Sequence, residues 1–333
     1  MLETFIIFLS INILILISYN YLAKIVNVYD FPNKRKIHKL KTPLIGGVIL
    51  LINFLFLLIL IEFEAIYNLI IGNTFEKKFN YFLFLTSVFL IFLLGFIDDK
   101  IDINPNLKLF CLFLLISFIQ FFDNSIIITE LRFSFTENFL YLEKYSFLFT
   151  SLCFLLFINA CNMFDGINLQ SCMYYLILSL YLISLDFKNL FLIVMIISII
   201  IICILNSKGK IFMGDSGVFL CSFVLAYFTV RYYNMSIINY SDKIFILMMV
   251  PGIDMFRLFM FRILKNKNPF RPDNFHIHHI LLKKFTYLQT ILIIFLLVNI
   301  PIILSFFDVS SFFIVLAFLF SYFFLIINHL KKG

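Results

Sequence analysis

Long apolar segments follow one another along the whole chain, and no other feature constrains its fold as strongly. A helix needs about 20 mostly apolar residues to cross the hydrocarbon core of a bilayer. Eleven such segments occur, at residues 4–23, 44–61, 81–97, 107–122, 146–164, 171–185, 190–205, 217–230, 243–261, 288–306 and 310–328. Helices and short loops thus use up all 333 residues. We therefore expect an all-α, polytopic membrane protein with about 11 transmembrane helices, forming a single integral-membrane domain over residues 1–333.

Composition excludes an ordinary soluble domain. Hydrophobic residues make up 62% of the chain and charged residues 14%, whereas soluble domains are about half apolar and a quarter charged. The six cysteines form no CxxC pair and fall in or beside apolar segments, which favours buried apolar side chains over disulfides or a metal site. The first segment lacks the basic start and the cleavage site of a signal peptide, and we interpret it as a retained helix.

Charged residues are divided unevenly between the two sets of loops. If the segments alternate in direction, the loops on the side that follows the first segment carry 19 of the 26 Lys and Arg residues. Basic loops stay in the cytoplasm, so we expect the amino end outside and the carboxyl end inside. The eight acids on the cytoplasmic side are all Asp, whereas the seven Glu fall outside. Short carboxylates on one side suggest fixed geometry around metal or phosphate. Outside, residues 123–145 could form a short strand pair.

Five polar clusters fall in the loops assigned to the cytoplasm, and the first covers residues 30–47. It contains Lys36 and His38 in a basic run, then Gly46 and Gly47. Topology and anionic lipid headgroups explain the basic run equally well. The glycine pair is expected to begin a helix with exposed backbone N–H groups, which would suit an anion or a nucleotide.

The second cluster places three carboxylates, Asp98, Asp99 and Asp102, at the end of an apolar segment. Acids at the bilayer edge are costly and are candidates for function, although a solvated turn is the alternative. Neighbouring carboxylates suit work as a general base. Lys108 begins the next helix, where it could meet a lipid phosphate as a point charge.

The third and fourth clusters supply oxygen ligands. Asn159 and Asn162 are three residues apart, so they share one helix face, and Asp165 extends that face if the helix continues. The two Asn amides could contact a metal or a base edge, and packing between helices is the alternative. Asp215 lies in a Gly-Asp-Ser-Gly run at a helix start, where the alternative is a simple turn. Few carboxylates combined with substrate phosphates are what Mg²⁺ prefers.

The fifth cluster contains Arg271 and three histidines, His276, His278 and His279. Three histidines in four residues suggest zinc at first sight. No Cys lies nearby, however, and the other clusters offer oxygen ligands. Contact with a pyrophosphate, helped by the arginine, fits better.

In this order and on one predicted face, the clusters resemble the polyprenyl-phosphate N-acetylhexosamine-1-phosphate transferases, the superfamily of WecA, TagO and MraY. The likeness runs over residues 28–283, and the His-Ile-His-His run resembles the WecA/TagO branch. The resemblance implies that Asp98, Asp99 and Asp165 are catalytic and that Asn162 and Asp215 hold Mg²⁺, with Mn²⁺ as an alternative. It implies substrate binding by Lys108, Asn168, Arg271, His276, His278, His279, Lys36, His38, Gly46 and Gly47.

The implied reaction transfers N-acetylhexosamine 1-phosphate from a UDP-sugar, by default UDP-GlcNAc, to undecaprenyl phosphate. UMP is released, and the step initiates a cell-surface glycan such as O-antigen. The implied partners are the lipid phosphate, the UDP-amino sugar and the bacterial inner membrane, with no nucleic acid and with a homodimer left open. An MraY-like pentapeptide transferase and a transporter are the alternatives, although a transporter should carry polar residues near the bilayer midplane. One departure from the family is Leu169-Gln170, where a glycine followed by Leu or Ile is usual.

Overall fold

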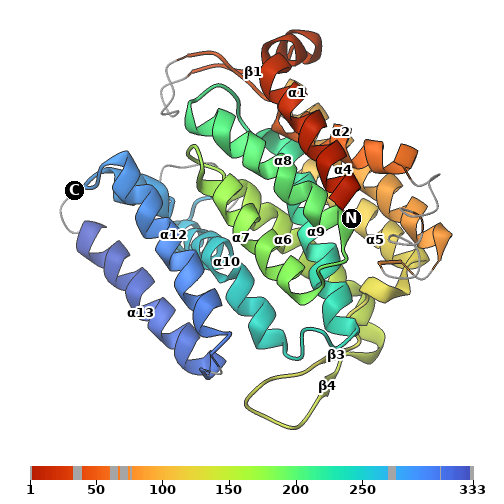
Figure 1. The fold of residues 1–333 in the computed structure, drawn as a ribbon. Helices are drawn as coiled ribbons and strands as arrows, with labels where there is room; N and C mark the ends of the chain where they lie inside the picture. The colour runs from red at the N-terminus through yellow and green to blue at the C-terminus, as the bar shows by residue number, and fades with distance from the viewer. Residues whose placement is uncertain are drawn as a thin grey trace. The chain divides into compact units, whose positions relative to one another are not determined.

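The computed structural model describes residues 2–32, 40–60, 67, 74–75, 77–268, 275–307 and 309–330. Helices account for most of them (Figure 1). In chain order the helices are α1 (Leu2–Val26), α2 (Gly46–Leu60), α4 (Lys78–Ile101), α5 (Pro105–Phe122), α6 (Ser146–Phe164), α7 (Gln170–Leu185), α8 (Leu190–Ser207), α9 (Gly214–Asn234), α10 (Ser241–Leu264), α11 (Ile277–Leu282), α12 (Tyr287–Leu304) and α13 (Ser311–Leu330).

Two short antiparallel strand pairs and two 3-10 turns complete the described elements. Strand β1 (Tyr29–Asp30) pairs with β2 (Thr42–Pro43), and β3 (Glu130–Leu131) pairs with β4 (Leu140–Tyr141). The turns are η1 (Asn124–Ile126) and η2 (Glu143–Tyr145). The second strand pair confirms the prediction for residues 123–145.

The helices have the length and composition of membrane spans. Within the described residues, 8 helices are long and apolar enough to cross a bilayer, and three shorter apolar helices cover Gly46–Leu60, Gln170–Leu185 and Ser311–Ile327. Each of the predicted apolar segments overlaps one of these helices closely. The prediction of an all-α, polytopic membrane protein is confirmed.

The chain forms two compact units. Unit 1 comprises Met1–Ile126 and Tyr175–Phe228, and unit 2 comprises Ile127–Tyr174 and Thr229–Gly333. Each unit combines segments that are distant in the sequence, and each contains part of the predicted site.

In unit 1, glycines allow the backbones of three helices to touch. A Cβ on Gly47 in α2 would lie 2.5 Å from the backbone nitrogen of Gly217 in α9. A Cβ on Gly95 in α4 would lie 2.6 Å from the Cα of Ser216. Because no side chain fits at these positions, the start of α9 is fixed against α2 and α4. Aromatic rings pack farther along, with the rings of Phe84 and Tyr227 4.7 Å apart.

In unit 2, α10 is the central helix. It packs against α6, α12 and α13, and the short α11 packs against α12 and α13. His276, His278 and His279 are therefore carried by a bend and a short helix that pack against longer helices. Neither the bend nor α11 would be stable alone, since helices this short need tertiary packing.

Candidate active site

In unit 1, the Lys108 ammonium lies between two carboxylates. Its Nζ is 2.6 Å from Oδ2 of Asp98 and 3.2 Å from Oδ2 of Asp215. Asp98 also accepts a hydrogen bond of 2.8 Å from the backbone N–H of Ile103. The three charged side chains come from the end of α4 and the first turns of α5 and α9. Three helix ends therefore bring these charges together.

The beginning of α5 is well defined for a reason visible in the sequence. Asn104 caps the helix by accepting a hydrogen bond of 3.0 Å from the N–H of Asn106, and Pro105 occupies the first turn. Asp102 ends α4 in the left-handed conformation, with its N–H donated to the carbonyl of Asp98. The tight link between α4 and α5 brings Lys108 back toward the acids.

Asp99 has a different environment from its neighbour in the sequence. Its carboxylate accepts hydrogen bonds from the N–H of Asp215 (2.7 Å), the N–H of Ser216 (3.1 Å) and the Ser216 hydroxyl (2.7 Å). It therefore caps the start of α9, where free N–H groups and the helix dipole favour a negative charge. Gly214 is required beside it, because its φ is 72° and a Cβ would lie 2.7 Å from Asp99 Oδ2.

Gly46 and Gly47 do not present free N–H groups, and that expectation is wrong. The N–H of Gly46 donates to the Phe212 carbonyl and the N–H of Gly47 to the Met213 carbonyl, each at 3.1 Å. Both glycines are buried. Their backbone donors are used to fasten α2 to the segment before Asp215, and an anion would have to displace these bonds.

In unit 2, the loop after α6 is held from three sides. The Asp165 carboxylate accepts a hydrogen bond from the Ser171 hydroxyl. The backbone carbonyl of Asn168 accepts one of 2.6 Å from the Tyr287 hydroxyl. A Cβ on Gly166 would lie 2.0 Å from Nε2 of His278, so the imidazole lies directly against the glycine. The loop and the histidine cluster thus form one packed arrangement.

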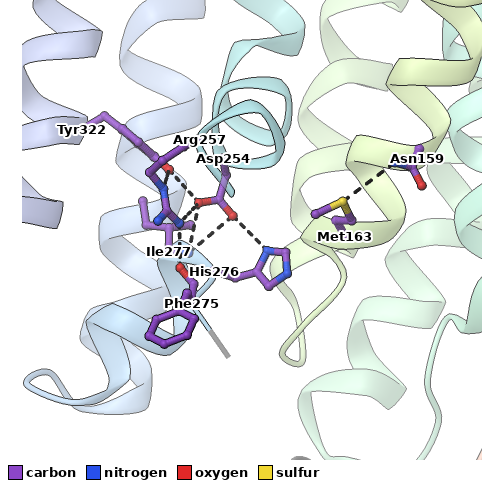
Figure 2. A network of polar contacts seen from close by, with 8 residues as sticks. All are labelled: Asn159, Met163, Asp254, Arg257, Phe275, His276, Ile277 and Tyr322. Atoms are coloured by element: carbon purple, nitrogen blue, oxygen red, sulfur yellow. Dashed lines mark hydrogen bonds and ion pairs between the residues drawn. The ribbon is translucent and has the colours of Figure 1, made fainter. Parts of the chain in front are cut away.

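Asn159 and Asn162 lie near the end of α6, before this loop, and their surroundings differ. Asn159 lies with its amide nitrogen 3.8 Å from the Met163 sulfur (Figure 2) and 3.4 Å from the Met255 sulfur. These contacts favour packing between helices for Asn159. Asn162, one turn nearer the loop, is half-buried.

The three histidine rings pack against one another. The rings of His276 and His278 are 5.4 Å apart and nearly parallel, and those of His278 and His279 are 4.3 Å apart. Burial holds the pKa of His278 well below its usual range, and the neighbouring His279 and His276 add to this effect. His278 is therefore neutral at pH 7. In the part of the chain that the structure describes, no group of three or more His, Cys, Asp or Glu could hold a metal ion.

A buried carboxylate that the sequence did not single out holds His276 (Figure 2). Asp254 in α10 lies 3.1 Å from Nδ1 of His276, and it accepts hydrogen bonds from Arg257 (2.7 Å) and from the Tyr322 hydroxyl (2.6 Å). The i,i+3 spacing of Asp254 and Arg257 is a helical ion-pair pattern that the sequence did contain. No comparable signal pointed to Tyr322 in α13.

The predicted site residues divide between the two units. Unit 1 holds Gly46, Gly47, Asp98, Asp99, Lys108 and Asp215. Unit 2 holds Asn162, Asp165, Asn168, His276, His278 and His279. Lys36, His38 and Arg271 lie outside the described residues. Within each unit, residues from distant parts of the sequence come together at the ends of helices.

These observations define a polytopic helical membrane protein whose charged and polar side chains gather at helix ends. Residues 81–233 match the model of glycosyl transferase family 4, a range that includes Asp98, Lys108 and Asp215. Over these residues the chain is similar to members of this family.

Relatives of known name cover most of the chain. The undecaprenyl-phosphate alpha-N-acetylglucosaminyl 1-phosphate transferase of Yersinia pestis is 26% identical over 271 residues, which span 78% of this chain and 70% of the relative. The proteins of the same name from Haemophilus influenzae and Thermotoga maritima are 27% identical over 303 residues and 28% identical over 275 residues. These matches span 85% and 82% of this chain, and 79% of each relative.

Proposed function

We propose that this protein transfers N-acetylglucosamine 1-phosphate from UDP-GlcNAc to undecaprenyl phosphate and releases UMP, which initiates a cell-surface glycan such as O-antigen. The names of the relatives support this substrate pair. The observation that carries the proposal is the placement of Lys108 between Asp98 and Asp215. A fixed cation flanked by carboxylates at helix ends can position phosphate groups and neutralise the charge that phosphoryl transfer develops.

In the proposed reaction, an oxygen of the lipid phosphate attacks the β-phosphorus of the UDP-sugar. The bond between that phosphorus and the bridging oxygen breaks, and UMP leaves with the electron pair. Lys108 would hold the lipid phosphate, while Asp98 would fix the lysine and take up any proton remaining on that phosphate. Asp99 would act through α9, by holding the backbone that presents Asp215.

Unit 2 would bind the nucleotide sugar. Asn168 lies in the loop that Tyr287 and His278 hold in place, and its amide can donate to and accept from a base edge. The histidines and Arg271 would contact the pyrophosphate and the sugar. Asp165, which the Ser171 hydroxyl orients, would be the acidic group nearest this loop.

The side chains suit Mg²⁺, which we propose as the cofactor, with Mn²⁺ as a substitute. Of the two carboxylates that contact Lys108, Asp215 is the more accessible, with 34% of its side chain exposed against 3% for Asp98. Mg²⁺ commonly takes one or two carboxylates together with substrate phosphates. Asp215 would contribute a ligand to the ion, which would neutralise charge on the pyrophosphate when bound.

The proposed setting is the bacterial inner membrane, with eleven spans, the amino end outside and the carboxyl end in the cytoplasm. The excess of Lys and Arg in one set of loops supports this orientation. The same loops contain the ends of α4 and the starts of α5 and α9, so the site would face the cytoplasm, where nucleotide sugars are made.

The test is release of UMP by purified protein supplied with undecaprenyl phosphate, Mg²⁺ and a panel of UDP-N-acetylhexosamines. We expect release only when lipid and metal are both present, with UDP-GlcNAc as the best donor. Asp215→Ala should abolish turnover, and Asp186→Ala, which changes an acid outside the site, should not. No release with any donor from folded protein would refute the proposal.

A further inference from the structure

Asp254 is a fully engaged buried carboxylate, and the pattern of its bonds is asymmetric. Only 2% of the residue is exposed. Its Oδ1 accepts from Arg257 at 2.7 Å, from the Tyr322 hydroxyl at 2.6 Å and from the N–H of Ile277 at 3.2 Å. Its Oδ2 lies 3.1 Å from Nδ1 of His276 and also accepts a longer bond of 3.4 Å from the N–H of Ile277. Removing this carboxylate would leave several buried donors unpaired, which is costly. The same bonds hold the carboxylate in one orientation.

These contacts determine which nitrogen of His276 carries the proton. An ionised carboxylate can only accept hydrogen bonds, and Arg257 keeps Asp254 ionised by pairing with it. Nδ1 of His276 must therefore be the donor. Nε2, on the other side of the ring from Asp254 (Figure 2), is the nitrogen left for other partners. Carboxylates orient histidines in the same way at many metal and catalytic sites.

The ring is also held on its faces. His276 stacks on His278 at 5.4 Å and 6°, and His278 in turn lies against Gly166 in the loop that contains Asn168. The ion pair is braced from α13, since the Tyr322 hydroxyl also accepts a hydrogen bond of 2.9 Å from Nε of Arg257. Tyr322 is fully buried and lies beyond the residues that match the family model.

We propose that Asp254, Arg257 and Tyr322 are positioning residues that fix His276 in the Nδ1–H tautomer and turn its Nε2, which is then an acceptor, toward a hydroxyl of the nucleotide sugar. The role of Nε2 rests on the proposed function, whereas the tautomer does not. Asp254 touches no substrate in this scheme. It acts through the imidazole, as a buried acid does when it holds a histidine for catalysis.

The first test is the nitrogen NMR spectrum of protein labelled with ¹⁵N at histidine, which is tractable because the chain has five histidines. We expect His276 to be protonated at Nδ1. In Asp254→Asn, the amide oxygen should stay at the Oδ1 position, where Arg257 and Tyr322 donate. Its NH₂ group then faces His276, and the ring should switch to the Nε2–H tautomer. His276 protonated at Nε2 in the wild type, or no switch in a folded variant, would overturn the proposal.

The second test is the kinetics of UMP release. Loss of a group that orients a functional histidine commonly costs about 10- to 100-fold, and we expect this loss in kcat/KM for the UDP-sugar with Asp254→Asn. The KM for the lipid phosphate should change little. A loss confined to the lipid KM would contradict the proposal.

Tyr322→Phe is the milder variant, needed because Asp254→Asn could prevent folding. It should reduce kcat/KM for the UDP-sugar several-fold. The matched control is Tyr174→Phe, which removes another buried hydroxyl of unit 2, one that donates to the Leu247 carbonyl at 3.1 Å. Equal effects of the two Tyr→Phe changes would overturn the proposal. A wild-type protein without transferase activity would refute the proposed function, and the NMR result would still decide the tautomer.

Discussion

Asp99→Ala removes the acceptor for three donors at the start of α9, and we expect it to act mainly on stability. The three hydrogen bonds measure 2.7, 3.1 and 2.7 Å. A hydrogen bond to a charged group contributes about 1.5–3 kcal/mol, and losing a helix cap costs about 0.5–2 kcal/mol. Since the bonds share one acceptor, their contributions do not add. We expect the free energy of unfolding to fall by about 3 kcal/mol.

A double-mutant cycle with Ser216→Ala isolates the capping interaction. Ser216 is buried, and its hydroxyl makes one of the three hydrogen bonds to Asp99. Ser216→Ala alone should therefore cost about 1 kcal/mol. In the Asp99→Ala background the serine hydroxyl has already lost that acceptor. The same change should then cost almost nothing, which gives a coupling energy of about 1 kcal/mol.

The assay is chemical unfolding of the purified protein in detergent, with UMP release measured on the same samples. Asp98→Ala is the matched control, because it removes the neighbouring acid and leaves the cap of α9 intact. If Asp99→Ala is as stable as the wild type but inactive, Asp99 acts on the substrate and the capping argument is wrong.

Three further predictions follow from single positions. Gly47→Ala should destabilise unit 1 by about 3 kcal/mol or prevent folding, because the new Cβ would lie 2.5 Å from a backbone atom. The control is Gly252→Ala, where a Cβ meets nothing within 4 Å, and it should be neutral or stabilising in the same unfolding assay. The lowered pKa of His278 means that unfolding takes up a proton at low pH. The free energy of unfolding should therefore be constant above the unfolded pKa of about 6.5 and should fall as the pH drops through it. His278→Gln should make the free energy of unfolding less dependent on pH, and an unchanged dependence would contradict the argument. Leu169 has a φ of 67°, a backbone conformation that costs energy for any residue except glycine. Leu169→Gly should raise the free energy of unfolding by about 0.5–1 kcal/mol, because the relief of strain exceeds the entropy cost of glycine. A clear fall in the free energy of unfolding would show that the packing of the Leu169 side chain matters more.

Hydropathy predicted the helices well because each must place about 20 apolar residues in succession, a property of the local sequence. The strand pair in residues 123–145 was also predictable from local pattern. The departure at Leu169 was visible in the sequence too, and the structure gives it a physical meaning. The backbone keeps the left-handed conformation that glycine favours, although the residue is leucine.

Long-range partners account for what the sequence did not reveal. Asp98 and Asp99 look equivalent as neighbours, yet one pairs with Lys108 and the other caps α9, 116 residues away. The N–H groups of Gly46 and Gly47 were expected to be free because their acceptors lie far along the chain. Tyr322 could not have been identified, since nothing about a tyrosine in an apolar helix indicates that it contacts a buried ion pair.

The brace from α13 has a consequence for how the protein is made. This helix is synthesised after α10, so Asp254 and Arg257 gain the Tyr322 hydroxyl only once α13 has followed them. A chain that stopped before residue 311 would contain every predicted site residue and would still lack this support for His276. Competence to bind the nucleotide sugar would then depend on α13, and a truncation that removed this helix would act on a site that its sequence position does not suggest.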